Sequence, residues 1–219
     1  MRELLDRILE FIATLKAARE CKKKRPKKIP YVAICVGHSR IGDKGARSVG
    51  GVNEWSYNKI VADLLKEQLK QRAIHSIVID EYPEESYSAA MNWLAGKLKE
   101  EKCDIAIELH FNSFTTSLAE GYEYLHYDSS AYGKKLALCL HKAHSESVNV
   151  QKDRGVKAVG EGGRGYSFLK RVPPPAVICE PFFGSSPKEW VLLGDKQAAI
   201  ADIYAEGIAK YFGVWKVRF

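Results

Sequence analysis

Four side chains that can bind a metal or carry a proton stand at comparable points of this sequence. His38, His110 and Glu180 each come at the end of an apolar, strand-like run, and Glu54 comes at the start of a helical stretch. Two imidazoles and one carboxylate form the donor set of a catalytic zinc site, which leaves a fourth position for water. A second carboxylate, not bound to metal, is then needed to move protons. The sequence therefore predicts a hydrolytic zinc site if the fold brings these residues together.

The body of the chain has the pattern of a single α/β domain. Apolar runs alternate with amphipathic stretches of helical length, which predicts a mainly parallel twisted sheet of about six strands with helices on both faces. Ligands bind beyond the carboxyl ends of the strands in such sheets, and that is where the four residues would meet. The expected strands are 31–36, 74–80, 104–110, 121–127 and 176–180, and the expected helices are 54–72, 86–99, 131–147 and 198–212.

Each of these residues also has an ordinary structural interpretation. A histidine at the end of a strand is more often a satisfied polar residue than a metal ligand. Glu54 could be an acid that the helix dipole favours in a first turn, and Glu180 could pair with Arg171. Among the other histidines, we expect surface positions for His141 and His144. The convergence of all four candidates at one sheet edge is what favours the catalytic interpretation.

Ordered motifs along the body resemble one known family. They are Gly37-His38 with Asp43-Lys44-Gly45-Ala46, Glu54 with Asn58, His110-Phe111-Asn112, Arg154-Gly155-Val156-Lys157, and Pro175 to Glu180. With this order and spacing, the chain resembles the zinc-dependent N-acetylmuramoyl-L-alanine amidases of bacterial autolysins and phage endolysins from about residue 31 to residue 212. The resemblance implies that His38, Glu54 and His110 hold one Zn²⁺ per chain and that Glu180 is catalytic.

The resemblance also implies a reaction. It is the hydrolysis, in peptidoglycan, of the amide between the lactyl group of N-acetylmuramic acid and L-alanine, by an endolysin or an autolysin. Two alternatives stay open at this point: a zinc peptidase that cuts within the stem peptide, and a wall-binding protein without catalysis.

Further residues near the motifs are expected to serve the site. Glu108 stands where the family usually has a small residue, and it shares a strand face with His110 because the two are two positions apart. We expect Glu108 to orient a ligand from outside the metal's own donor set, or else to be an alternative ligand. Asn112, Arg154 and Arg164 are expected to bind the substrate, whose stem peptides carry carboxylates.

The positive charge of the chain is concentrated at its N-terminus. Residues 1–30 hold ten Lys or Arg against four Asp or Glu, and thus six of the seven net positive charges. We expect an arm, residues 1–29, made of an amphipathic helix and a basic linker, before a zinc amidase domain at 30–219. The arm is either a solvated tail or a tether to an anionic envelope polymer. The near-neutral body argues against a nucleic-acid partner.

Cysteine use and hydropathy indicate where such a chain works. It has five cysteines and no CxxC motif, which is typical of folding in a reducing compartment. No apolar stretch reaches the roughly 18 residues of a transmembrane helix, and Glu3, Asp6 and Glu10 interrupt any signal-peptide core. We expect synthesis in the cytoplasm without a signal peptide, followed by action on the cell wall or in the periplasm after release at lysis.

Overall fold

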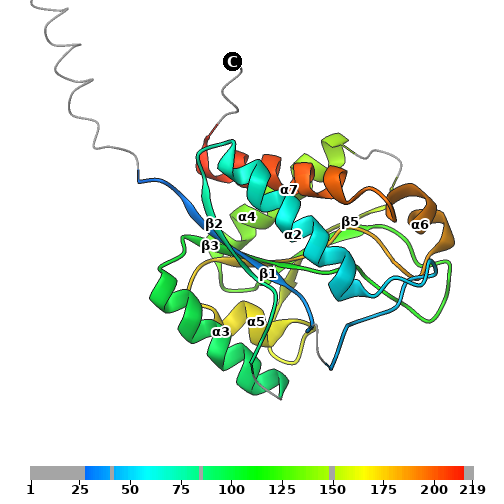
Figure 1. Ribbon diagram of the computed structural model, residues 1–219, viewed down its shortest axis with the longest axis horizontal. Helices are drawn as coiled ribbons and strands as arrows, with labels where there is room; N and C mark the ends of the chain where they lie inside the picture. Colours follow the sequence, from blue (N-terminus) through cyan, green and yellow to red (C-terminus); the bar gives the residue numbers. More distant parts are fainter. Residues whose placement is uncertain (1–27, 40–41, 84–85, 148–150, 215–219) are drawn as a thin grey trace, which may run out of the picture.

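The computed structural model describes residues 28–39, 42–83, 86–147 and 151–214 (Figure 1). Most of the expected arm, residues 1–29, lies outside the described residues, and so does its expected helix. Among the helices of the described ranges, none combines the length and apolar character that a membrane crossing requires.

One six-stranded sheet forms the centre of the domain. Its order is β2-β1-β3-β6-β4-β5, and neighbours run parallel except that β4 is antiparallel to β6. This confirms the expected mainly parallel α/β sheet. The strands are β1 (Tyr31–Val36), β2 (His75–Ile79), β3 (Ile105–Leu109), β4 (Tyr122–Tyr127), β5 (Asp153–Val159) and β6 (Ala176–Glu180).

Helices cover both faces of the sheet, as expected (Figure 1). The helices α2 (Glu54–Lys70), α4 (Ala131–Ser147) and α7 (Gln197–Phe212) pack on one face, and α3 (Tyr87–Glu101) and α5 (Tyr166–Arg171) pack on the other. The central strands β1, β3 and β6 are buried on both faces, which explains their near-continuous apolar sequences. A sheet held rigidly on both sides gives its strand ends fixed positions.

Three elements are not predicted by the sequence pattern. The strand β5 lies at the sheet edge, is largely exposed, and contains Gly155 at a φ of +81°. The helices α5 and α6 (Pro187–Leu193) have six and seven residues. Helices of this length are too short to show a hydrophobic period, although Ser186, which accepts the Glu189 N–H, and Pro187 are a typical helix start.

The apolar residues of α2 do not all face the core. The sequence pattern predicts Ile60, Leu64, Leu65 and Leu69 along one side of this helix, but Ile60 is 49% exposed and Leu64 is 37% exposed. The buried residues of this helix include Leu65, Leu69 and Val61. The side of the helix that is buried follows from Glu54, which faces inward at the first turn.

The expectation of a surface position is wrong for His144. Its ring is fully buried and stacks on Tyr122, with the ring centroids 3.9 Å apart. Its Nδ1 accepts a hydrogen bond from the Tyr124 hydroxyl and its Nε2 donates one to Gln151, both at 2.8 Å. Burial lowers the pKa of His144 to about 4, so the ring is neutral and serves as a structural cross-link between α4 and β4.

Candidate active site

The backbone after β1 delivers His38 to the carboxyl edge of the sheet in a left-handed conformation. Its φ is +67°, which non-glycine residues adopt rarely and at a free-energy cost. The carboxylate of Asp43 orients the ring, because its Oδ2 lies 2.9 Å from Nδ1 while its Oδ1 accepts the Gly45 N–H. The other ring nitrogen, Nε2, lies 3.3 Å from Oε2 of Glu54. His38 is thus held so that Nε2 points at Glu54.

Glu54 is the first residue of α2, and its carboxylate is buried. Oε1 lies 2.8 Å from Nδ1 of His110 and accepts the Phe111 N–H, and Oε2 accepts the Ala46 N–H at 3.0 Å. Burial by itself would raise the pKa of this carboxyl, but hydrogen bonds and charge from His110 and His38 lower it to about 2. The carboxylate is therefore ionised, as a metal ligand must be.

His110 follows β3, and its ring lies over a glycine. A Cβ on Gly37 would come within 2.2–2.6 Å of three atoms of the His110 ring, so only glycine leaves room for it there. Nε2 of the ring lies 3.3 Å from Oε2 of Glu108. Burial would lower the pKa of His110, but Glu108 and Glu54 together hold it well above its usual range. The ring is thus fixed between two carboxylates, with Nδ1 toward Glu54.

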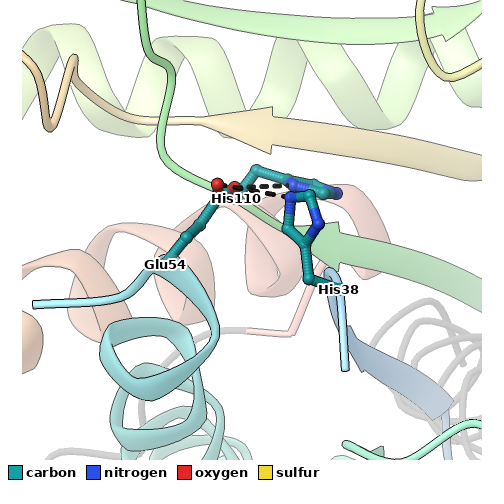
Figure 2. Close-up of side chains that lie close together, drawn as sticks. All are labelled: His38, Glu54 and His110. Atoms are coloured by element: carbon teal, nitrogen blue, oxygen red, sulfur yellow. Dashed lines mark hydrogen bonds and ion pairs between the residues drawn. The ribbon is translucent and has the colours of Figure 1, made fainter. Parts of the chain in front are cut away.

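These three side chains converge on one point, as Figure 2 shows. His38, Glu54 and His110 each offer one ligand atom, and the three atoms lie within 4.8 Å of one another. The two rings meet edge to face with centroids 5.1 Å apart. Two imidazole nitrogens and one carboxylate oxygen fit a catalytic zinc ion, which takes three protein ligands and keeps one open position.

We expect Gly37→Ala to disrupt this centre. The new methyl group must displace the His110 ring, so zinc affinity should fall by more than about tenfold and the free energy of unfolding by about 1–3 kcal/mol. Chelator competition and chemical denaturation measure the two effects. The matched control is Gly96→Ala in α3, where a Cβ meets nothing within 4 Å. Unchanged zinc affinity in Gly37→Ala would contradict the assignment of His110.

Glu180 ends β6 beside this cluster, with a carboxylate in an unusual environment. The residue is 5% exposed, Oε1 lies 3.4 Å from Nη1 of Arg164, and Oε2 is buried without a partner among the described residues. Burial, with added repulsion from Glu54 and Glu123, raises the pKa of Glu180 to about 7, although His110 and Arg164 oppose the shift. A carboxyl with this pKa can both accept and release a proton near neutral pH.

The raised pKa of Glu180 has a consequence for stability without metal. The folded state holds the proton up to about pH 7 and the unfolded state only to about 4.5, so stability falls as pH rises through that window. The full loss is about 3 kcal/mol. In denaturant titrations of the metal-free protein, the free energy of unfolding of Glu180→Gln should therefore rise relative to that of the wild type between pH 5 and pH 8. An equal difference at both pH values would contradict this.

Glu123 belongs to the site, although the sequence did not point to it. Because β4 runs antiparallel to β6, its beginning lies at the carboxyl edge, and Glu123 pairs in register with Glu180. Its Oε2 accepts a hydrogen bond from Arg154 Nε at 2.9 Å, and its Oε1 accepts from Arg164 at 2.7 Å and from Asn112 at 3.0 Å. An acid between two buried tyrosines, 122 and 124, was the available clue.

The structure brings most of the expected substrate residues to the site. Asn112 and Arg164 line the cavity, and Arg164 Nη1 donates to Oδ1 of Asn112 at 2.9 Å. Arg154 lies beside them, where it bonds Glu123 and stacks over the Phe183 ring, 5.1 Å from its centroid. His126, late in β4, lies away from this edge, because β4 runs antiparallel to β6 and His126 pairs with Val177 near the start of β6.

A cavity of about 1040 Å³ opens at this edge of the sheet. All four candidate residues line it, together with Glu108. Arg171, the alternative partner of Glu180, instead donates to Ser88 and Asn92 on α3. The cavity therefore joins a cluster that can hold a metal ion and a carboxyl of raised pKa in one space large enough for part of a polymer, which is the arrangement of a hydrolytic site.

Solved structures of similar fold include amidases and the catalytic domain of an endolysin. The catalytic domain of CwlV from Bacillus (Paenibacillus) polymyxa var. colistinus is 24% identical, with a TM-score of 0.71, over 85% of this chain and 100% of that one. CwlD from Clostridioides difficile, solved with the GerS lipoprotein, is 22% identical, with a TM-score of 0.74, over 84% and 98%. The catalytic domain of the CD27L endolysin, which targets Clostridia difficile, is 26% identical, with a TM-score of 0.70, over 83% and 97%.

Sequence comparison gives the same family. Among curated proteins, no sequence matches this chain significantly. The family model described as N-acetylmuramoyl-L-alanine amidase, Amidase_3, matches residues 32–210, which include all four candidate residues. The chain therefore belongs to the family of N-acetylmuramoyl-L-alanine amidases, the amide hydrolases of peptidoglycan.

Proposed function

We propose that this chain cleaves the amide between the lactyl group of N-acetylmuramic acid and L-alanine in peptidoglycan, with one zinc ion per chain. The observation that carries the proposal is the convergence of His38, Glu54 and His110 within 4.8 Å, in a chain of the amidase family. Glu180, with its pKa near 7, lines the same cavity.

The residues divide the chemistry between them. His38, Glu54 and His110 would hold the zinc ion, which when bound lowers the pKa of water to about 7 and polarises a carbonyl. Glu180 takes the proton of the attacking water and passes it to the nitrogen of the leaving alanine. Its Oε2 suits this role, because among the described residues no donor contacts this oxygen and would have to be displaced before the proton arrives.

Three side chains are proposed to hold the substrate. Arg164 is half exposed and adjoins Glu180, so its guanidinium can meet a substrate carboxylate or carbonyl. Asn112 donates one amide N–H to Glu123, which leaves the other for a substrate carbonyl. Arg154 would act at the outer rim, where its contact with Glu123 also holds Arg164 in place.

Digestion of purified sacculi tests the reaction. An amidase releases intact stem peptides with a free L-alanine amine and leaves lactyl carboxylates on the glycan strands. Cuts elsewhere in the stem peptide would assign the site to a zinc peptidase, and binding without any product would assign it to a wall-binding protein. Zinc stoichiometry by elemental analysis, measured on the same sample, should give one ion per chain.

Glu108 is proposed to orient His110. It is buried, and its Oε2 lies 3.3 Å from His110 Nε2, which is the usual arrangement of a carboxylate behind a metal-binding histidine. We expect Glu108→Gln to weaken zinc binding about 10- to 100-fold in chelator competition, without loss of fold. Since Glu→Gln keeps the shape of the side chain, wild-type zinc affinity in this variant would rule the role out.

The basic arm is proposed to tether the enzyme to an anionic envelope polymer. Residues 1–27 carry most of the net positive charge of the chain, and such contacts weaken with salt. The test is to sediment purified sacculi with the full chain and with a chain lacking residues 1–27, at rising salt and under conditions in which the sacculi are not digested. Equal, salt-insensitive binding of both chains would exclude the tether.

We also propose that the enzyme reaches the wall on release at lysis, as an endolysin does.

A further inference from the structure

The cavity at the site is acidic, although the chain as a whole is basic. Five of its lining side chains are carboxylates, and one, Arg164, is a guanidinium. A bound dication and Arg164 would bring three positive charges to these five carboxyl groups, of which Glu180, with its pKa of about 7, is ionised only in part near neutral pH. Arg164 contacts Glu123 and Glu180 at one side of the cavity. Away from Arg164, the carboxylates that line the cavity favour a positively charged substrate group over an anionic one.

One wall of this cavity is aromatic and apolar. It includes Tyr82, Tyr87, Met91 and Trp93, from α3 and the segment before it. Tyr82 is fixed in place, because its hydroxyl donates to the Val36 carbonyl at 3.0 Å and its ring meets Trp93 edge to face, with centroids 6.3 Å apart. Tyr87 is 59% exposed, so its ring lies both on the cavity wall and at the surface.

Glu108 projects from the sheet into the same part of the cavity. It pairs in register with Cys35 on β1 and Ile178 on β6, and it points to the face that α3 covers. Its Oε2 adjoins His110, while the second oxygen has no such contact described. Burial and the nearby Glu108 carboxylate raise the pKa of Tyr87 to about 12, and Arg171, which is held on Ser88 and Asn92, opposes the shift.

We propose that this wall and Glu108 form a subsite for an aliphatic side chain that ends in an ammonium group. The methylene stem would pack on Met91 and the tyrosine rings. The ammonium head would meet the faces of the aromatic rings and the carboxylate of Glu108. In peptidoglycan, the group with this chemistry is the free amine of a diamino acid in the stem peptide. The inference rests on the proposed function and names the substrate feature that the same site selects.

Three soluble muropeptides that differ only at the third residue of the stem test the subsite. They carry lysine, Nε-acetyl-lysine or norleucine, and kcat/KM is measured for each with the zinc-loaded full chain. We expect lysine to exceed both others by about 10- to 30-fold, since a desolvated ammonium over aromatic rings gains that much. The preference should shrink as salt rises.

Variants separate the subsite from the metal centre. Glu108→Gln should lower all three rates through His110, so its readout is the lysine to norleucine ratio, which should fall below about threefold. Tyr87→Leu, at a residue outside the three proposed metal ligands, should reduce the same ratio without a change in zinc affinity. The matched control is Tyr132→Leu on α4, a tyrosine of similar exposure (68% against 59%) that is not among the residues lining the cavity. It should keep the wild-type ratio.

The outcomes are distinct. Cleavage of all three muropeptides with equal kcat/KM overturns the subsite and leaves the amidase function standing. A lysine preference that survives both Glu108→Gln and Tyr87→Leu also overturns it. If none of the three gives a free alanine amine, the proposed function fails, and the subsite fails with it.

Discussion

Glu180→Gln should reduce turnover by about a thousandfold and leave the metal bound. The amide has the shape of the carboxyl but cannot accept the proton of the attacking water, and general acid–base catalysis is worth about 10²–10⁴ in rate. Glu180 is not one of the three converging ligands, so zinc stoichiometry should stay at the wild-type value. The rate is measured as release of alanine amines from sacculi.

A matched control for this variant is Glu67→Gln on the exposed side of α2. It removes one carboxylate from the surface and should keep the wild-type rate and metal content. Lysis by Glu180→Gln at near the wild-type rate would show that another group moves the proton, and Glu123, its register partner on β4, would be the next candidate.

Glu54→Gln should remove both the metal and the activity. The substitution takes away the only carboxylate among the three ligands and leaves two imidazoles with a neutral neighbour. We expect zinc affinity to fall by more than about a hundredfold, because even partners outside the donor set contribute 10- to 100-fold. Elemental analysis after dialysis and the rate on sacculi measure the two losses.

Chelation provides the corresponding test on the wild-type chain. Exhaustive removal of metal should abolish activity, and added Zn²⁺ should restore it in the wild type but not, at stoichiometric concentration, in Glu54→Gln. A chain that stays fully active after chelation would end the zinc assignment for His38, Glu54 and His110 together.

The sequence was informative about those candidate residues whose position follows directly from the direction of a strand. His38, His110 and Glu180 follow parallel strands, whose carboxyl ends must share one edge of a sheet. Glu54 was placed at the same edge as the acid at the start of the helix after the first strand, and the family motif supported this placement, since a first-turn acid alone is common. Glu123 could not be predicted, because its place depends on β4 running against β6, and strand direction is not encoded in an apolar run.

Local patterns also could not show which charges pair within the site. Arg154 and Arg164 looked like free cations near the cleft, but both contact Glu123, and only the fold brings that carboxylate to them. The same holds for His144. Its neighbours on α4 suggested a surface helix face, and its burial arises from Tyr122 and Tyr124 on a strand the pattern could not orient.

Because β4 runs antiparallel to β6, the backbone hydrogen bonds between these two strands hold Glu123 beside Glu180, the proposed proton carrier. A slip of β4 by one residue along β6 would turn Glu123 to the opposite face of the sheet and release both arginines. Length changes within residues 113–120 should consequently be tolerated, since they leave these hydrogen bonds untouched. An insertion between Tyr122 and Leu125 should leave a folded domain whose arginines no longer have a fixed position.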